Sequence, residues 1–220
     1  MKIAATSDTL GNLPEIIGEF DLFIHCGNFS PQFEYISIES QIEKQTDWME
    51  FNFKPWLQSI RATHKIVIAG HLDFGAQWIS RDLQYHIGAT TLQDESITLN
   101  HNLIHGMNWL MPSKDLSIID PSITGRSVYI LKQKERFIAA CKLIPDDVDI
   151  LITRMPPYGI LDEVNNKNVG SSHLLDRIKE LKKVKLHIFG LISETGGSYI
   201  VSNNVTYANA SVKGFIELSI

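Results

Sequence analysis

Polar side chains suited to holding a ligand follow several short apolar runs of this sequence. They are Asp8, Asn28, His71, Asp73, Arg154, Ser193 and Asn209. Carboxylate, imidazole and amide groups coordinate cations, and a guanidinium binds a phosphate through two parallel N–H donors. These residue types therefore have the chemistry of a cation site or of a phosphate site.

The elements that must position these residues alternate between short strands and helices. Apolar runs predict strands over residues 2–6, 21–25, 65–69, 149–153 and 185–189. The segments between them predict helices over residues 13–20, 33–58, 75–85, 133–143 and 172–183. Buried strands joined by helical crossovers are typical of an α/β fold. Ligands gather at the carboxyl ends of the strands in such sheets, so we expect the polar residues to meet at one site.

Turn signals indicate further elements. Alternating residues around Asn-rich turns predict one hairpin over residues 97–109 and another over residues 199–209. Residues 214–220 are expected to form a last strand, and residues 112–127 are the longest loop-like stretch. Pro55 is expected to break or restart the long helix that contains it, because proline lacks the backbone N–H that a helix interior needs.

Length and charge limit the classes of protein that fit. The 220 residues suit a single α/β domain spanning residues 1–220, with a substantial core. Lys and Arg total 20 and Asp and Glu total 25, which gives a net charge of -5. This balance argues against a nucleic-acid partner attracted by bulk charge.

Cysteine usage and hydropathy indicate the compartment. Cys26 and Cys141 are far apart and do not have the spacing of a metal motif, so we expect reduced thiols in a cytoplasmic protein. The apolar run at residues 1–5 is too short for a signal peptide, and no run approaches the length of a membrane span. Neither secretion nor a membrane partner is expected.

Six loop sequences occur in a characteristic order along the chain. They are Thr6-Ser7-Asp8-Thr9-Leu10, His25-Cys26-Gly27-Asn28, Ala69-Gly70-His71-Leu72-Asp73, Thr153-Arg154-Met155-Pro156-Pro157, Phe189-Gly190-Leu191-Ile192-Ser193 and Asn209-Ala210-Ser211. Together they resemble the loops of the calcineurin-like metallophosphoesterase superfamily, in its small single-domain metallophosphodiesterase branch. The resemblance implies a four-layer αββα sandwich, in which two mostly parallel or mixed sheets are flanked by helices.

The same resemblance implies a catalytic centre of two divalent ions, such as manganese, iron or zinc, that polarise the phosphoryl oxygens and activate a water. This sequence departs from that pattern at nearly every position. Asp8 is retained, whereas Leu10 replaces a His, Asn28 the bridging Asp, His71 the amide, Leu72 the catalytic His, Arg154 a His, and Leu191 and Ser193 the last two His. We therefore expect no dinuclear centre, no metal cofactor and no catalytic residue.

The sequence leaves two roles open for several of these residues. Asp8 is either a lone metal ligand or a carboxylate that pairs with Arg154 or accepts backbone N–H groups. His71 is either a ligand or phosphate contact, or a hydrogen-bonded loop histidine. Arg154 either binds a phosphate at the mouth of the site or forms a salt bridge with Asp8. His187 lies within an apolar run and is expected to be a core histidine.

Three functions follow as hypotheses. The favoured one is a pseudoenzyme whose former cleft binds a phosphate or nucleotide ligand. The second is a weak or altered metal-dependent phosphodiesterase or phosphatase that uses Asp8 and His71. The third is an interaction module that docks a protein partner through the cleft or through residues 33–58.

Overall fold

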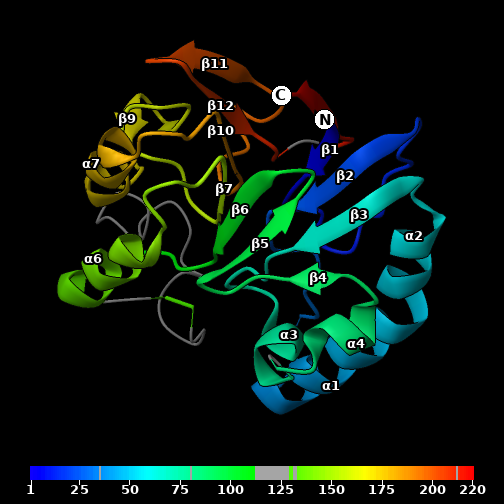
Figure 1. Ribbon diagram of the computed structural model, residues 1–220. Coiled ribbons are helices and arrows are strands. Elements are labelled where there is room, and N and C mark those ends of the chain that lie inside the picture. The colour runs from blue at the N-terminus through cyan, green and yellow to red at the C-terminus, as the bar shows by residue number, and fades with distance from the viewer. Residues whose placement is uncertain (35, 80, 112–128, 131–132, 212) are drawn as a thin grey trace.

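The computed structural model describes residues 1–34, 36–79, 81–111, 129–130, 133–211 and 213–220. In this part of the chain, two large sheets lie face to face, and helices cover their outer surfaces (Figure 1). The α/β sandwich of two mixed sheets flanked by helices, expected from the sequence, is confirmed.

The first sheet positions the N-terminal loops. Its strands, in spatial order, are β13 (Ile216–Ser219), β1 (Lys2–Thr6), β2 (Phe20–His25), β3 (Ala62–Val67) and β4 (Thr90–Thr91). β1 to β4 are parallel and β13 is antiparallel to β1. The register pairs Thr6 with His25 and His25 with Val67. The loops that follow β1, β2 and β3 therefore leave from one edge.

The second sheet positions the C-terminal loops. Its strands, in spatial order, are β11 (Tyr199–Ser202), β12 (Val205–Asn209), β10 (Leu186–Phe189), β7 (Ile150–Thr153), β6 (Asn102–Met107) and β5 (Glu95–Leu99). The inner strands β12, β10, β7 and β6 are parallel, and β11 and β5 are antiparallel to their neighbours. Phe189 pairs with both Thr153 and Asn209, so the loops after these strands also share an edge. A small ribbon of β8 (Glu163–Val164) and β9 (Lys167–Asn168) follows β7.

Three apolar layers hold the sandwich together. The layer between the sheets is rich in isoleucine, including the fully buried Ile24, Ile66, Ile152 and Ile188. Separate clusters fill the space between each sheet and its helices. Removing apolar surface from water is the main driving force for folding, so these layers fix the sheets against each other and hold the loop edges in place.

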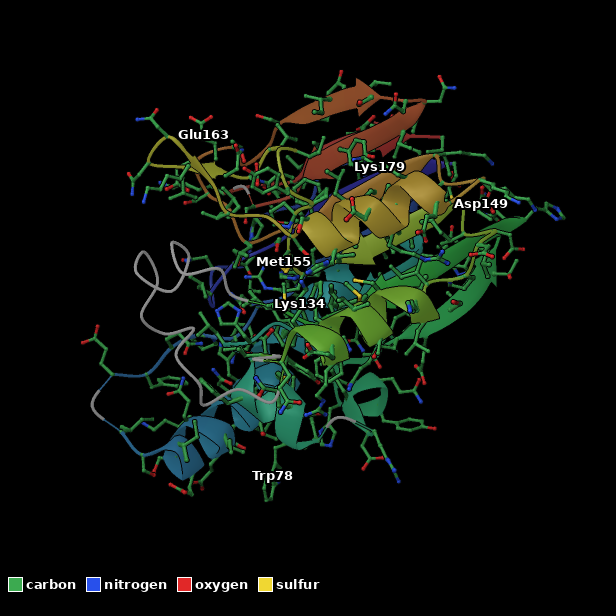
Figure 2. The ribbon with its side chains drawn as sticks, turned by 90° about the vertical axis from the view of Figure 1, so that its left-hand side faces the viewer. Trp78, Lys134, Asp149, Met155, Glu163 and Lys179 are labelled. Carbon is green, nitrogen blue, oxygen red and sulfur yellow. The ribbon has the colours of Figure 1, made fainter. Side chains whose placement is uncertain are left out.

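The helices divide between the two outer faces. Their bounds are α1 (Ile38–Trp48), the π-helix η1 (Met49–Phe53), α2 (Lys54–Ser59), α3 (Phe74–Trp78), α4 (Leu83–Ile87), α6 (Lys134–Leu143) and α7 (Ser172–Glu180). α1 to α4 lie on the first sheet (Figure 1). Figure 2 looks onto α6 and α7, which lie side by side over the second sheet. None of the helices in the described chain combines the length and apolar character needed to span a membrane.

Some predicted helices were wrong. Residues 13–20 form no helix, because Pro14 interrupts the segment and Gly18 has a φ of 128°. The segment 33–58 becomes helical only at Ile38, where the Ser37 side chain caps the first turn. Pro55 does restart the helix, since it stands in the first turn of α2, just after the π-helical turn. The helix expected over 75–85 is divided into α3 and α4.

Most other elements match the sequence prediction. α6 and α7 occupy the predicted segments 133–143 and 172–183, although α7 ends at Glu180. Both hairpins are present, as β5–β6 and β11–β12, and β13 is the last strand. The predicted loop over residues 112–127 lies outside the described residues. The apolar side chains Met49, Phe53 and Leu57 of the segment 33–58 are fully buried, which identifies its apolar stripe as core.

Candidate functional site

Asp8 is the centre of the candidate site. It follows β1 by two residues and has a φ of 56°, a left-handed conformation. Its Oδ2 accepts hydrogen bonds from Ser7 Oγ at 2.8 Å, from the Leu191 N–H at 2.8 Å and from Ser211 Oγ. The loops after β1, β10 and β12 are thereby tied to one carboxylate.

Arg154 supplies the opposite charge. It follows β7 directly and its side chain is 0% exposed. Its Nη1 donates to Asp8 Oδ2 at 3.2 Å and its Nη2 donates to Asp8 Oδ1. The ion pair with Asp8, which the sequence offered as one alternative for both residues, is therefore present. Within the described chain, Arg154 Nε has no hydrogen-bond partner.

The ion pair determines the protonation of Asp8. Burial opposes ionisation, but the charge of Arg154 and the hydrogen bonds from Ser211 and Leu191 outweigh it and lower the pKa of Asp8 to about 2. The carboxylate is consequently charged at neutral pH, with its negative charge balanced by the adjacent guanidinium.

Asn28 follows β2, and its side-chain amide both donates and accepts a hydrogen bond. Its Nδ2 donates to Asp8 Oδ1 at 3.1 Å, and its Oδ1 accepts from the Leu72 N–H at 3.0 Å. Both ends of the side chain are thus used inside the protein. Asn28 therefore joins the loop after β3 to Asp8.

Asp73 holds the backbone of two loops. It is fully buried and accepts N–H groups from Asn28 at 2.8 Å, Ser30 at 2.8 Å and Gly70 at 2.7 Å. Burial raises the pKa of Asp73 to about 6, although the N–H donors and the charge of Arg154 favour its carboxylate form. His71 lies in the same loop and is also buried. Neither residue lines the cavity at Asp8.

A cavity of about 480 Å³ lies above Asp8. Its lining residues are Asp8, Thr9, Asn12, Pro14, Ser193, Ser211 and Lys213. Of the residues predicted from the sequence, Asp8 and Ser193 line it, whereas the buried Arg154 contacts Asp8 and is not part of the lining. Asn209 instead orders the neighbouring loop, since its Nδ2 donates to Ile192 O at 2.7 Å and Thr195 Oγ1 at 2.9 Å.

Sequence reasoning missed the cation of this cavity, Lys213. It lies in the segment between β12 and β13, where no motif marks it, and only the antiparallel return of β13 beside β1 brings it to the site. Ser211 lay within a motif loop but was not singled out. Its hydroxyl donates to Asp8 Oδ2 and its own N–H donates to Asn209 Oδ1 at 3.0 Å.

The donors at this edge do not fit a pair of divalent cations. Asp8 is already shared among Arg154, Asn28 and three further donors, and Asn28 is neutral. Among the described residues, no three His, Cys, Asp or Glu side chains come together as a metal site requires. A cation placed beside Asp8 would also face the buried positive charge of Arg154.

Comparison with known proteins decides the family. The chain is 30% identical over 213 residues to metallophosphoesterase domain-containing protein 1 of Homo sapiens and of Mus musculus, covering 87% of this chain and 60% of each relative. The chain belongs to the metallophosphoesterase superfamily. It is also 24% identical to UPF0046 protein K07C11.7 of Caenorhabditis elegans, over 96% of this chain and 69% of that protein. The chain thus spans less than two thirds of the length of the human and mouse metallophosphoesterase relatives.

Two further comparisons are less informative. No protein-family model matches the chain. A solved structure described as "GAP50 the anchor in the inner membrane complex of Plasmodium" is similar over 96% of this chain and 71% of that chain, with 12% identity and a TM-score of 0.45.

Several loop residues around Asp8 have a left-handed backbone although they are not glycine. Leu10 and Leu191, which the sequence resemblance sets at histidine positions, have φ values of 48° and 84°. Asn28, which the same resemblance sets at the bridging position, has a φ of 55°. Left-handed backbone at a residue other than glycine costs roughly 1–2 kcal/mol. In this conformation the Leu191 N–H donates to Asp8 Oδ2. The strained backbone therefore contributes one hydrogen bond to the carboxylate of the ion pair.

Proposed function

We propose that this chain is a non-catalytic member of the metallophosphoesterase superfamily, in which the guanidinium of Arg154 takes the place of the divalent cations. The observation that carries the proposal is the fully buried Arg154 side chain paired with both oxygens of Asp8. A carboxylate that is already neutralised inside the protein has little to gain from a metal ion.

The chemistry of the superfamily supports this proposal. Hydrolysis there depends on cations that polarise the phosphoryl group and lower the pKa of a water molecule. Removing a residue that merely orients a ligand costs 10–100-fold in metal affinity, so the loss of ligands themselves should be more severe. Arg154 supplies a positive charge to Asp8, but a guanidinium does not generate a hydroxide nucleophile.

Metal analysis of the purified chain tests the proposal directly. The chain is incubated with manganese or with zinc and then desalted. We expect elemental mass spectrometry to find far less than one equivalent of metal per chain. Arg154→His serves as a comparison, because it removes the internal charge and restores one family ligand. Two equivalents of tightly held metal in the unmodified protein would overturn the proposal.

The competing function is a weak metal-dependent phosphodiesterase or phosphatase. Hydrolysis of bis-(p-nitrophenyl) phosphate, with and without manganese, separates the two. We expect a rate equal to that of Asp8→Ala/His71→Ala in both conditions. A manganese-dependent rate that this double variant lacks would establish the hydrolase instead.

The cavity above Asp8 supports a ligand-binding role for the non-catalytic protein. Its lining includes the ammonium group of Lys213 and the carboxamide of Asn12, which are donors suited to a phosphate group. Its volume of about 480 Å³ is within the range of small-molecule sites. We therefore assign the proposed phosphate or nucleotide contact to the rim of the cavity, where Lys213 supplies the positive charge.

Calorimetric titration with inorganic phosphate and with adenosine monophosphate tests this assignment. Lys213→Ala should weaken binding, because it removes the cation of the cavity. Lys182→Ala is a matched control on the exposed surface after α7 and should bind as the unmodified chain does. Binding that is absent for both probes, or unaffected by Lys213→Ala, would remove the phosphate-site assignment while leaving the non-catalytic proposal intact.

A further inference from the structure

The outer edge of β11 is unusually apolar for a sheet edge. β11 is an end strand of the second sheet within the described chain, and it lies on the outside of the molecule (Figure 1). Tyr199, Ile200 and Val201 are consecutive in it and are 61%, 37% and 67% exposed. Sheet edges are normally protected by charged residues, proline, bulges or short length, since an open edge invites another strand.

The other sheet edges do carry such protection. β4 has two residues, β5 begins with the exposed Glu95, and β13 contains Glu217, which pairs with Lys2 at 3.3 Å. In contrast, residues 195–212 contain no charged side chain. Two β11 edges could therefore approach each other without like-charge repulsion.

The hairpin geometry identifies which backbone groups face outward. Asn203 and Asn204 form a two-residue turn with φ values of 50° and 62°, and the turn is closed by the pair Ser202 and Val205. In such a hairpin the closing pair is hydrogen-bonded and the pattern then alternates. Ser198 O accepts the Asn209 N–H at 3.0 Å, which agrees with this alternation.

Ser198, Ile200 and Ser202 consequently direct their backbone groups toward β12. Tyr199 and Val201 direct their N–H and C=O groups away from the sheet. The residues with outward backbone groups are thus also the two with the most exposed side chains of the strand. One extended strand laid along this edge would satisfy both features.

We propose that β11 pairs antiparallel with β11 of a second copy of this chain, so that the second sheet continues across a two-fold dimer. With Ile200 opposite Ile200 of the second copy, Tyr199 meets Val201 of that copy, and these residues exchange N–H···O bonds in both directions. The side chains of Tyr199 and Val201 then lie beside each other across the boundary. This register is self-complementary, as a two-fold interface requires.

Sedimentation over a range of concentrations tests whether the chain dimerises. We expect a monomer–dimer equilibrium for the full chain. Val201→Lys should be monomeric over the same range, because it places a charge on the pairing edge. Trp78→Lys is the matched control, because Trp78 is 74% exposed on α3 and projects away from the body of the molecule (Figure 2). The Trp78→Lys variant should still dimerise. Circular dichroism checks that both variants fold.

Cysteine cross-linking tests the register. Ile200→Cys should form a disulfide-linked dimer under mild oxidation, since a non-hydrogen-bonded antiparallel pair brings Cα atoms to about 4.5 Å, within disulfide range. Ser202→Cys should not, because its counterpart lies several residues away along the ladder. A chain that is monomeric throughout, a dimer that survives Val201→Lys, or stronger cross-linking through Ser202→Cys would each overturn the proposal.

Discussion

Arg154 and Asp8 are 146 residues apart in the sequence, yet the guanidinium of one contacts both carboxylate oxygens of the other. The Arg154 side chain is fully buried, whereas that of Asp8 is 20% exposed toward the cavity. The pair joins the carboxyl edge of the first sheet to that of the second. Its removal should therefore affect both the stability of the protein and the electrostatics of the cavity.

A double-mutant cycle should reveal strong coupling between these two residues. Arg154→Met leaves a carboxylate without its counter-charge, and Asp8→Asn leaves a buried guanidinium without one. Each change should lower the free energy of unfolding by about 3–5 kcal/mol, as is typical when one partner of a buried pair is removed. The combined variant should lose much less than the sum, because no uncompensated charge remains. Urea unfolding measures all four proteins, and additive losses would contradict the coupling.

Acid should destabilise the protein through Asp8. Its pKa falls from the ordinary value of 3.8 to about 2 in the folded state. A lowered carboxyl pKa contributes stability that is present above about pH 4 and is lost as the pH falls toward 2. The contribution should be about 2 kcal/mol. Urea unfolding between pH 2 and pH 5 should show this loss in the unmodified protein.

The comparison with Asp8→Asn isolates that effect, since the amide does not titrate. Asp73, whose pKa is raised to about 6, makes the protein less stable as the pH rises from about 4 to 6. That opposite trend is present in both proteins and cancels in their difference. Equal pH profiles below pH 4 would show that Asp8 is not the titrating group.

Gly190 is required by the close packing around the ion pair. A Cβ there would lie 2.0 Å from Ser7 Oγ, 2.7 Å from Arg154 Nη1 and 2.8 Å from Asp8 Oδ2. Gly190→Ala should therefore destabilise the chain by about 1–3 kcal/mol or more, as overpacked interiors do. Gly214→Ala is the control, because nothing lies within 4 Å of the added atom. Thermal unfolding compares them, and equal melting temperatures would contradict the packing described.

Leu10 offers a route to a more stable protein. It has a φ of 48° and its side chain is 42% exposed, so it combines backbone strain with little packing. Leu10→Gly should stabilise the fold by about 0.5–1 kcal/mol, the relief of left-handed strain less the entropy of a freer unfolded chain. Leu10→Ala retains the strain and should not be stabilised. A Leu10→Gly protein that unfolds at lower urea concentration would contradict this interpretation.

From the sequence it was possible to predict that the polar loops meet at one edge of the fold. The contacts that each polar residue makes there were harder to predict. Short strands followed by polar loops imply a common edge in any parallel sheet, and Asp8, Asn28 and Arg154 do meet there. The choice between a salt bridge and an exposed arginine depends on the depth at which Arg154 lies. That depth is set by the packing of the two sheets, which no local pattern records. Asp73 is a similar case, since it binds backbone N–H groups of loops that are distant in sequence.

The helix wrongly predicted over residues 13–20 has a local explanation. Leu13, Ile16 and Ile17 have helical spacing, but Pro14 and the left-handed Gly18 exclude a helix.

Lys213 could not be found from the sequence, because an isolated lysine in a connecting segment has no distinguishing pattern. Its place at the cavity follows from the pairing of β13 with β1, the most distant contact in sequence that the chain makes within a described sheet.

Covalent attachment of the positive charge has a consequence for regulation. The stabilisation that a bound ion gives a protein varies with the free concentration of that ion and disappears in a chelator. A guanidinium carried on the chain is present at unit occupancy whenever the chain folds. If Arg154 replaces the cations as proposed, the shape of this cavity is the same in metal-starved and metal-replete surroundings, and only the ligand decides when it is filled.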